Sequence, residues 1–193
     1  MNLRHFNRII ILLSIAFLSA CKATHTATRS PVPAVKPGTS VTSTVILKEK
    51  ISPRIINAGN VSATEVVTYA ERFLHVPYLW AGTSPDKGFD CSGLIFYTFR
   101  QFKINTPRVS KEFTNAGTEV STLNSMRGDI ILFTGSDPSS GVVGHMGLIT
   151  ENHNGIIRFI HAASGEGAGV IISPMSTYYV QRFVKVIRVF KNM

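Results

Sequence analysis

The chain has 193 residues, 44% of them hydrophobic, and a formal net charge of +9. Its positive charge is unevenly distributed, because residues 1–59 hold eight Lys/Arg and one acidic residue, whereas residues 60–193 hold twelve and ten. A protein that binds nucleic acid through a folded domain concentrates basic residues on that domain, so we exclude a nucleic-acid partner.

The N-terminus has the features of a secretion signal. Arg4 and Arg8 form a basic region, and an apolar run over residues 9–18 follows, which is too short for a good membrane span. The run ends in Ser19-Ala20-Cys21, which resembles a bacterial lipobox. We therefore predict a lipoprotein signal peptide over 1–20 and lipidation of Cys21. Ordinary signal cleavage near Ala20 is the alternative.

Residues 21–59 form a predicted flexible basic tether, since the segment after Cys21 is rich in Thr, Ser, Pro, Ala and Val. A basic segment beside a lipid anchor favours attraction to anionic lipid or wall polymer. By resemblance to enterobacterial sorting, Lys22 after the lipidated cysteine predicts an outer-membrane protein that faces the periplasm. The bilayer is then a partner through acylated Cys21.

Residues 60–193 have the length of one domain of ordinary size. Its first predicted helix begins with the capping box Ser62-Ala63-Thr64-Glu65 and ends by Pro77. A second predicted helix begins at Cys91 and runs to about Phe102.

Short runs rich in β-branched and aromatic residues then predict strands over 130–134, 145–150, 156–162, 170–173 and 183–190. Helices first and strands afterwards indicate an α+β fold, in which the helices pack on an antiparallel sheet of about five or six strands.

Cys91 lies between a turn-rich run and the second predicted helix, with Asp90 as its N-cap. The partial positive charge at a helix N-terminus favours thiolate, so we expect the pKa of Cys91 to be lowered. An inert buried cysteine is the alternative. If Cys21 carries lipid, Cys91 has no second thiol to pair with in an oxidising compartment, which favours a nucleophile.

A thiol nucleophile needs a base, and the base needs an orienting group. If strands 145–150 and 156–162 form a hairpin with a five-residue loop, His145 and His161 face each other on one side of the sheet. A two-residue Asn154-Gly155 turn instead places them on opposite faces. Both registers stay open from the sequence. The first would let His145 take the proton of Cys91 while His161 fixes its tautomer.

A zinc site is disfavoured, because no close pair of Cys and His ligands occurs. We expect no metal and no other cofactor.

Five runs carry a family resemblance: residues 77–99 (PYLWAGTSPDKGFDCSGLIFYTF), TPRVS, RGDIILF, GHMGLIT and IHAAS. In this order they resemble the NlpC/P60 cysteine peptidases over about residues 62–190. The resemblance implies a papain-like α+β fold, with Cys91 as nucleophile, His145 as base and His161 as the third residue.

The resemblance also implies roles for residues near the thiol. Tyr78 would donate to the oxyanion beside the Cys91 N–H, or be an aromatic core residue. Asp90 and Ser92 match residues that bind the polar stem of the substrate, and Asp90 is also the expected cap. Arg108 and Ser110 would contact a carboxylate, with surface solvation as the alternative for Arg108. Ala81 stands where the family has glycine, and Phe113 where it often has glutamine.

The implied function is a cysteine endopeptidase that cuts peptidoglycan stem peptides or cross-links in the lipid-anchored murein endopeptidase branch. We expect a monomer with peptidoglycan peptides as its substrate. One alternative is a non-catalytic lipoprotein that binds peptidoglycan or a partner. Another is a papain-like amidase or acyltransferase acting on another amide.

Overall fold

The computed structural model describes residues 55–165 and 169–191. The predicted signal peptide (1–20), the lipidation site Cys21 and most of the predicted tether (21–59) lie outside the described residues. Ile56 and Ala58, which precede the predicted boundary at residue 60, are buried in the core. None of the described helices is long and apolar enough to cross a bilayer.

Two helices begin where the sequence predicts. Helix α1 spans Ala63–Glu71, and the Ser62 hydroxyl accepts a hydrogen bond from the Glu65 N–H at 3.4 Å. Helix α2 spans Cys91–Gln101, with Asp90 as its N-cap. Helix α1 ends six residues before Pro77, because the chain turns and His75 adopts a positive φ of 71°. A 3-10 helix, η1 (Ser110–Asn115), and a one-turn helix, α3 (Thr177–Val180), were not predicted.

The predicted antiparallel sheet is confirmed, with six strands in the order β3-β8-β4-β5-β6-β7. The strands are β3 (Thr118–Val120), β4 (Ile130–Thr134), β5 (Val143–His153), β6 (Ile156–Ala163), β7 (Gly169–Pro174) and β8 (Phe183–Arg188). A small hairpin of β1 (Thr83–Ser84) and β2 (Gly88–Phe89) precedes α2. The sequence did not predict β1, β2 and β3, because they are only two or three residues long.

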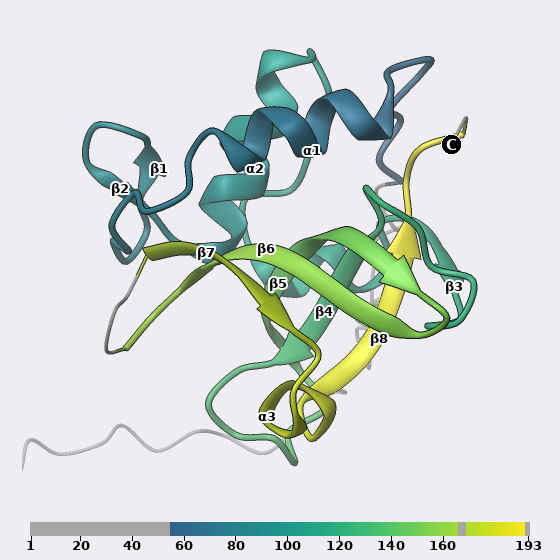
Figure 1. Cartoon of the computed structure of the whole chain (residues 1–193). Helices are drawn as coiled ribbons and strands as arrows, with labels where there is room; N and C mark the ends of the chain where they lie inside the picture. The colour runs from purple at the N-terminus through teal and green to yellow at the C-terminus, as the bar shows by residue number, and fades with distance from the viewer. Residues whose placement is uncertain (1–54, 166–168, 192–193) are drawn as a thin grey trace, which may run out of the picture. The chain divides into compact units, whose positions relative to one another are not determined.

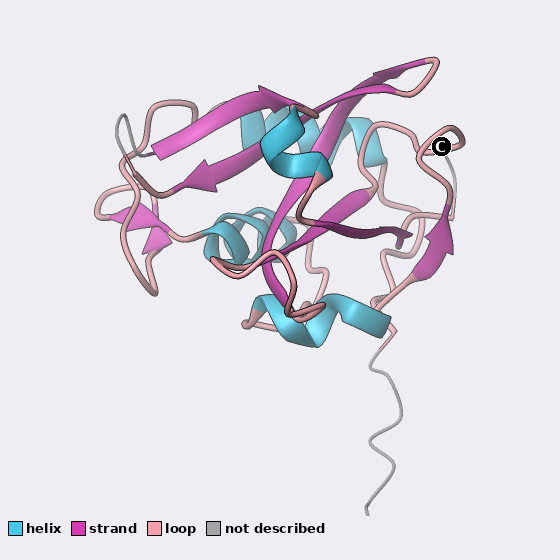
Figure 2. Cartoon of the chain, turned by 90° about the horizontal axis from the view of Figure 1, so that it is seen from below, coloured by secondary structure: helices cyan, strands magenta, loops and turns pink. Residues whose placement is uncertain are grey.

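The sheet has an apolar layer on each face. Helices α1 and α2 lie on one side of it in Figure 1, and Val66, Phe99, Met146 and Ile187 belong to the core between them and the strands. A smaller apolar cluster forms the second layer, on the opposite face of the sheet. Its buried members are Ile131, Phe133, Ile149, Ile157, Phe159 and Val186. Tyr179 of α3 packs on this cluster, and Figure 2, which views the molecule from below, has α3 in front of the sheet.

The hairpin between β5 and β6 follows neither predicted register along its whole length. His153 pairs with Ile156, so the turn is the two-residue Asn154-Gly155, with φ values of 52° and 90°. These positive angles fit a type I′ turn. Between Ile149 and Glu151 the register shifts by one residue at a β-bulge. Since one extra residue exchanges the two faces, the bulge returns both histidines to the same side.

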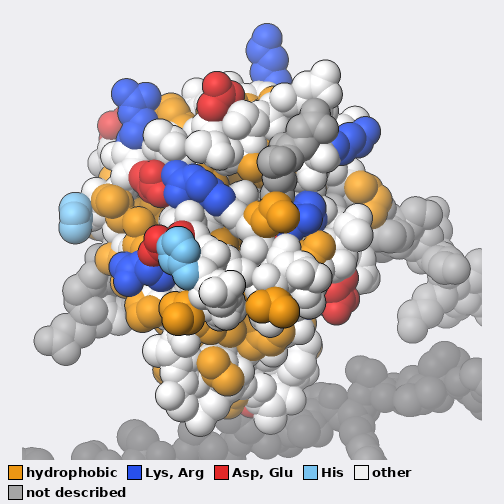
Figure 3. Space-filling view, turned by 45° about the vertical axis from the view of Figure 1, so that its right-hand side comes forward, with side chains coloured by type: hydrophobic (Ala, Val, Ile, Leu, Met, Phe, Trp, Pro, Cys, Tyr) orange, Lys and Arg blue, Asp and Glu red, His pale blue; other side chains and the backbone are white. Residues whose placement is uncertain are grey.

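Charged side chains of both signs are interspersed on the face of the domain that Figure 3 shows. Ion pairs of the domain include Arg127 with Glu71 at 2.9 Å and Lys185 with Glu119 at 2.9 Å. This mixed surface agrees with the charge distribution along the sequence.

Candidate active site

The cap of α2 fixes the candidate nucleophile. The Asp90 carboxylate accepts a hydrogen bond from the Gly93 N–H at 2.6 Å, which satisfies one of the unpaired N–H groups at the helix start. Cys91, the first residue of the helix, is 9% exposed and lines a cleft of about 830 Å³. Its sulfur lies 4.0 Å from the Gly144 carbonyl oxygen.

Glycine lets the loop before α2 approach the helix start. The Asp90 N–H donates to the Gly82 carbonyl at 3.1 Å. A Cβ atom built on Gly93 would overlap that same carbonyl oxygen. The backbone that precedes the thiol therefore rests directly on the helix that carries it, and only glycine fits at residue 93.

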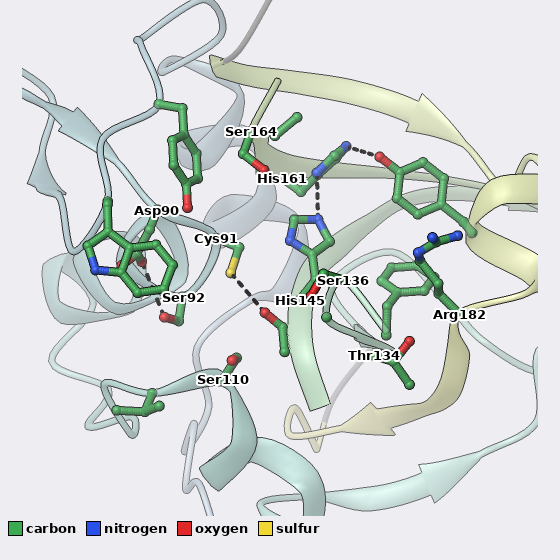
Figure 4. A pocket seen from close by; sticks show the side chains of 18 of the residues that line it. Asp90, Cys91, Ser92, Ser110, Thr134, Ser136, His145, His161, Ser164 and Arg182 are labelled. Carbon is green, nitrogen blue, oxygen red and sulfur yellow. Dashed lines mark hydrogen bonds between the residues drawn. The ribbon is translucent and has the colours of Figure 1, made fainter. Parts of the chain in front are cut away.

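His145 and His161 meet as the relay requires. His145 Nε2 and His161 Nδ1 are 2.9 Å apart. Figure 4 shows the His145 ring between the Cys91 sulfur and the His161 ring. The shifted register pairs Leu148 with Ile160, so Gly147 is the residue opposite His161 and His145 is two residues further along the same face. A Cβ atom on Gly147 would come within 3.2 Å of the His161 Cβ and 2.7 Å of the Phe159 ring.

The hydrogen-bond chain continues beyond His161. Its Nε2 lies 2.9 Å from the Ser173 hydroxyl and 3.3 Å from the Tyr179 hydroxyl. If His145 Nδ1 is to accept the thiol proton, its Nε2 must carry a hydrogen and donate to His161 Nδ1. His161 then carries its own hydrogen on Nε2 and donates it to a hydroxyl oxygen. Ser173 and Tyr179 thus fit the one pair of tautomers that leaves a base beside the thiol.

The prediction that the pKa of Cys91 is lowered is wrong for the folded domain. Burial, and then the negative charge of Asp90, raise the pKa of Cys91 from 9.0 to about 11. Hydrogen bonding from the backbone at Ser92, Met146 and Cys91 opposes this. The effect expected from the helix N-terminus is therefore present, but desolvation of a thiolate outweighs it.

Burial also keeps both histidines neutral. It lowers the pKa of His145 from 6.5 to about 4. Burial, and then the charge of His145, lower the pKa of His161 to about 3. At neutral pH the site accordingly holds a thiol and an uncharged imidazole. Proton transfer from Cys91 must then accompany substrate attack rather than precede it.

The Arg108 side chain is 33% exposed, but it is bound to the cap of α2 and is not a freely solvated surface arginine. Its guanidinium donates to both Asp90 carboxylate oxygens at 3.0 and 2.8 Å, and to the Ser92 hydroxyl at 2.9 Å. Ser92 also donates to Asp90 at 3.2 Å. Arg108 thereby holds the helix cap and partly neutralises the carboxylate that disfavours the thiolate.

Tyr78 and Ser110, which the resemblance also singled out, line the same cleft. Tyr78 is half-buried there, and burial, followed by the charges of Cys91 and Asp90, raises its pKa, so its hydroxyl stays a donor. Ser110 lies at the start of η1 on the cleft wall. Phe113, which stands where the family often has glutamine, is instead fully buried in the core. Trp80 is 83% exposed on the rim.

The sequence did not single out Ser173, Tyr179 as a partner of His161, or the cleft residues Thr134 and Arg182. Alternation along β7 places Ser173 on the same face as His161, but this signal depends on the pairing of β6 with β7. No group of three or more His, Cys, Asp or Glu side chains suited to a metal ion occurs among residues 55–165 and 169–191.

Ala81 adopts a positive φ of 59°. This left-handed conformation is energetically unfavourable for a residue with a Cβ atom. We expect Ala81→Gly to stabilise the domain by about 1 kcal/mol, measured as a higher urea midpoint, because the relieved strain exceeds the entropy that glycine adds to the unfolded chain. Ala70→Gly, inside α1, should have the opposite sign. A lower midpoint for Ala81→Gly would contradict this expectation.

Comparison with known proteins assigns most of the described region to one family. The sequence profile of the NlpC/P60 family matches residues 75–189. The chain is 32% identical over 193 residues to the murein DD-endopeptidase MepS/murein LD-carboxypeptidase of Escherichia coli K12, covering 98% of this chain and 96% of that protein. It is 35% identical over 129 residues to the gamma-DL-glutamyl hydrolase of Bacillus subtilis 168, covering 66% of this chain and only 29% of that protein.

Solved structures agree with this result. An NlpC/P60 family protein from Bacillus cereus aligns with a TM-score of 0.61 and 28% identity, over 69% of this chain and 42% of that one. The NlpC/P60 domain of the peptidoglycan hydrolase SagA aligns with a TM-score of 0.52 and 27% identity, over 66% of this chain and 99% of that one. These structures share the arrangement of helices packed against an antiparallel sheet.

Proposed function

Because the chain belongs to the NlpC/P60 family, we propose that it is a cysteine peptidase that hydrolyses peptide bonds of peptidoglycan stem peptides or cross-links. The observation that carries the proposal is the hydrogen-bonded pair His145–His161 beside the thiol of Cys91 in one cleft. Similarity to a murein endopeptidase over nearly the full length of both chains supports the substrate class.

In the proposed mechanism, the Cys91 sulfur attacks the amide carbonyl while its proton moves to His145. The tetrahedral oxyanion accepts hydrogen bonds from the Cys91 N–H and the Tyr78 hydroxyl. His145 then gives the proton to the leaving amine, and a thioester remains. Water, deprotonated by His145, attacks the thioester and restores the thiol. His161 keeps the His145 ring oriented and stabilises the imidazolium that forms.

The test is mass spectrometry of purified muropeptides, monomeric and cross-linked, after incubation with residues 22–193. Conversion of dimers to intact monomers would establish cross-link cleavage, and monomers shortened within the stem would move the cut to a stem bond. A Cys91→Ala sample serves as the blank. If the wild-type protein cuts neither class, the peptidase proposal is wrong and a binding module becomes the better interpretation.

We also propose that the protein is anchored in the outer membrane, facing the periplasm, through acylated Cys21. The sequence Ser19-Ala20-Cys21 after an apolar run supports this, together with the basic tether. We expect the full chain to incorporate labelled palmitate and to fractionate with the outer membrane, whereas Cys21→Ser does neither. Equal labelling of both would contradict the lipid anchor.

A further inference from the structure

The cleft extends past His145, away from Cys91, into a part that the proposed mechanism does not use. Phe133 on β4 pairs with His145 on β5, and the next residue, Thr134, lines the cleft. Arg182 lines it from the segment after α3, and its carbonyl accepts the Thr134 N–H at 2.8 Å. Figure 4 shows Thr134 and Arg182 on the far side of the His145 ring from Cys91.

This region holds polar groups whose hydrogen-bonding capacity is unused. Within the part of the chain that the structure describes, the Thr134 hydroxyl and the Arg182 Nε are buried and have no hydrogen-bond partner. Thr134 is 3% exposed. A buried polar group without a partner costs free energy, so two of them along one cleft suggest that a ligand completes their bonding.

The Arg182 guanidinium is held in place but is not neutralised. It stacks 3.8 Å from the centre of the Tyr178 ring, and its Nη1 donates to the Tyr178 carbonyl at 3.1 Å. No carboxylate of residues 55–165 and 169–191 forms an ion pair with it. Arg108, at the other end of the cleft, is bound to both oxygens of Asp90 instead. Between these two cleft arginines, Arg182 is therefore the one with charge available for a substrate carboxylate.

The position of Arg182 identifies the part of the substrate that it meets. Since His145 delivers a proton to the leaving amine, the leaving residue lies on the His145 side of the thiol. We propose that Arg182, together with the Thr134 hydroxyl, binds a free carboxylate on the residue that supplies the leaving amine. This inference rests on the proposed peptidase function and specifies which bonds the site selects.

The selected bonds are those whose leaving amine stands on a carbon that also bears a free carboxylate. A stem with a free C-terminal residue has this chemistry, and so does a cross-link made through the second amine of a diamino acid whose second amine carbon also bears a carboxylate, whereas the side-chain amine of a lysine does not. An internal stem bond does not, when the carboxyl of its leaving residue is itself in an amide. One subsite would thus accept both an endopeptidase cut at a cross-link and a carboxypeptidase cut at a stem end.

The test uses two synthetic peptides that differ only at the leaving residue, which is a free acid in one and a primary amide in the other. We expect wild type to cleave the acid with a kcat/KM about 10- to 100-fold higher, the range for hydrogen bonds to a charged group. Arg182→Gln should lose this preference, because the acid slows to about the rate of the amide. Arg182→Lys should keep part of it, and Thr134→Val should lower it less than Arg182→Gln.

The matched control is Arg158→Gln, which removes a half-exposed arginine of β6 that pairs with Glu151 outside the cleft. It should retain the full preference. A urea unfolding midpoint equal to that of wild type would verify that Arg182→Gln is folded. The inference is overturned if wild type cleaves acid and amide equally, or if Arg182→Gln slows both by the same factor. If wild type cleaves muropeptides but shows no preference for the acid peptide over the amide peptide, only this inference fails. If wild type cleaves neither muropeptides nor the synthetic peptides, the proposed function fails as well.

Discussion

Cys91→Ala and His145→Ala are each expected to lower kcat for muropeptide cleavage by at least about 10⁴-fold. Cys91 forms the covalent bond, and His145 carries the proton in the mechanism, because its ring lies beside the thiol and is hydrogen-bonded to His161. The double variant should be no slower than the slower single variant, because the two side chains act as one unit. His161→Ala should fall between His145→Ala and wild type, because it acts through His145.

The control for this series is His153→Ala. His153 lies on the same hairpin but is exposed at the turn, where it contacts Glu151 at 3.3 Å. Its removal should leave the rate unchanged. Rates are measured from the appearance of muropeptide products under single-turnover and steady-state conditions. Additive losses in the double variant would contradict a mechanism in which Cys91 and His145 share one proton.

The domain is expected to lose stability as the pH falls from 7 to 5. Burial depresses the pKa values of His145 and His161 in the folded state to about 4 and about 3, whereas both are 6.5 without that burial. At a pH between the folded-state pKa values and 6.5, the unfolded chain binds more protons than the folded domain. The free energy of unfolding therefore decreases as the pH drops below 6.5. Each group contributes about 2 kcal/mol over this interval, and the pair about 4 kcal/mol, because both histidines stay neutral in the folded domain down to pH 5.

The measurement is the urea unfolding midpoint at pH 7 and pH 5 for wild type and for His145→Gln/His161→Gln. The neutral amides cannot gain a proton, so the double variant should show a much smaller decrease between the two pH values. Both proteins keep the same carboxylates, so the difference between them isolates the histidines. Equal decreases would show that the histidines do not resist protonation in the folded domain.

The raised pKa of Cys91 changes which experiment distinguishes an enzyme from a binding module. From the sequence, an activated thiol should react with alkylating agents at lower pH than an ordinary one. In the folded domain, burial raises the pKa of Cys91 to about 11, so even the enzyme should alkylate slowly at neutral pH in the absence of substrate. Product formation from muropeptides therefore decides between the two, and alkylation alone does not.

Local sequence was sufficient for the features that depend on neighbouring residues. Ser62 and Asp90 begin the two helices because their side chains bond N–H groups three residues on, within the same turn. Strand β4 has the predicted bounds, because its run of β-branched and aromatic residues and its flanking glycines are local signals. The position of Cys91 at the start of α2 follows from the same cap. The family to which the chain belongs follows from five short sequence runs in a fixed order.

Tertiary structure alone decided what depends on residues far apart in the chain. The bulge beside Thr150 sets whether His145 and His161 share a face, and a turn sequence cannot reveal it. The binding of Arg108 to Asp90 leaves Arg182 as the candidate carboxylate ligand, although the sequence pointed to Arg108. The pKa of Cys91 rises because the whole domain excludes water from the thiol, an effect that sums over many distant atoms and exceeds the local effect of the helix start.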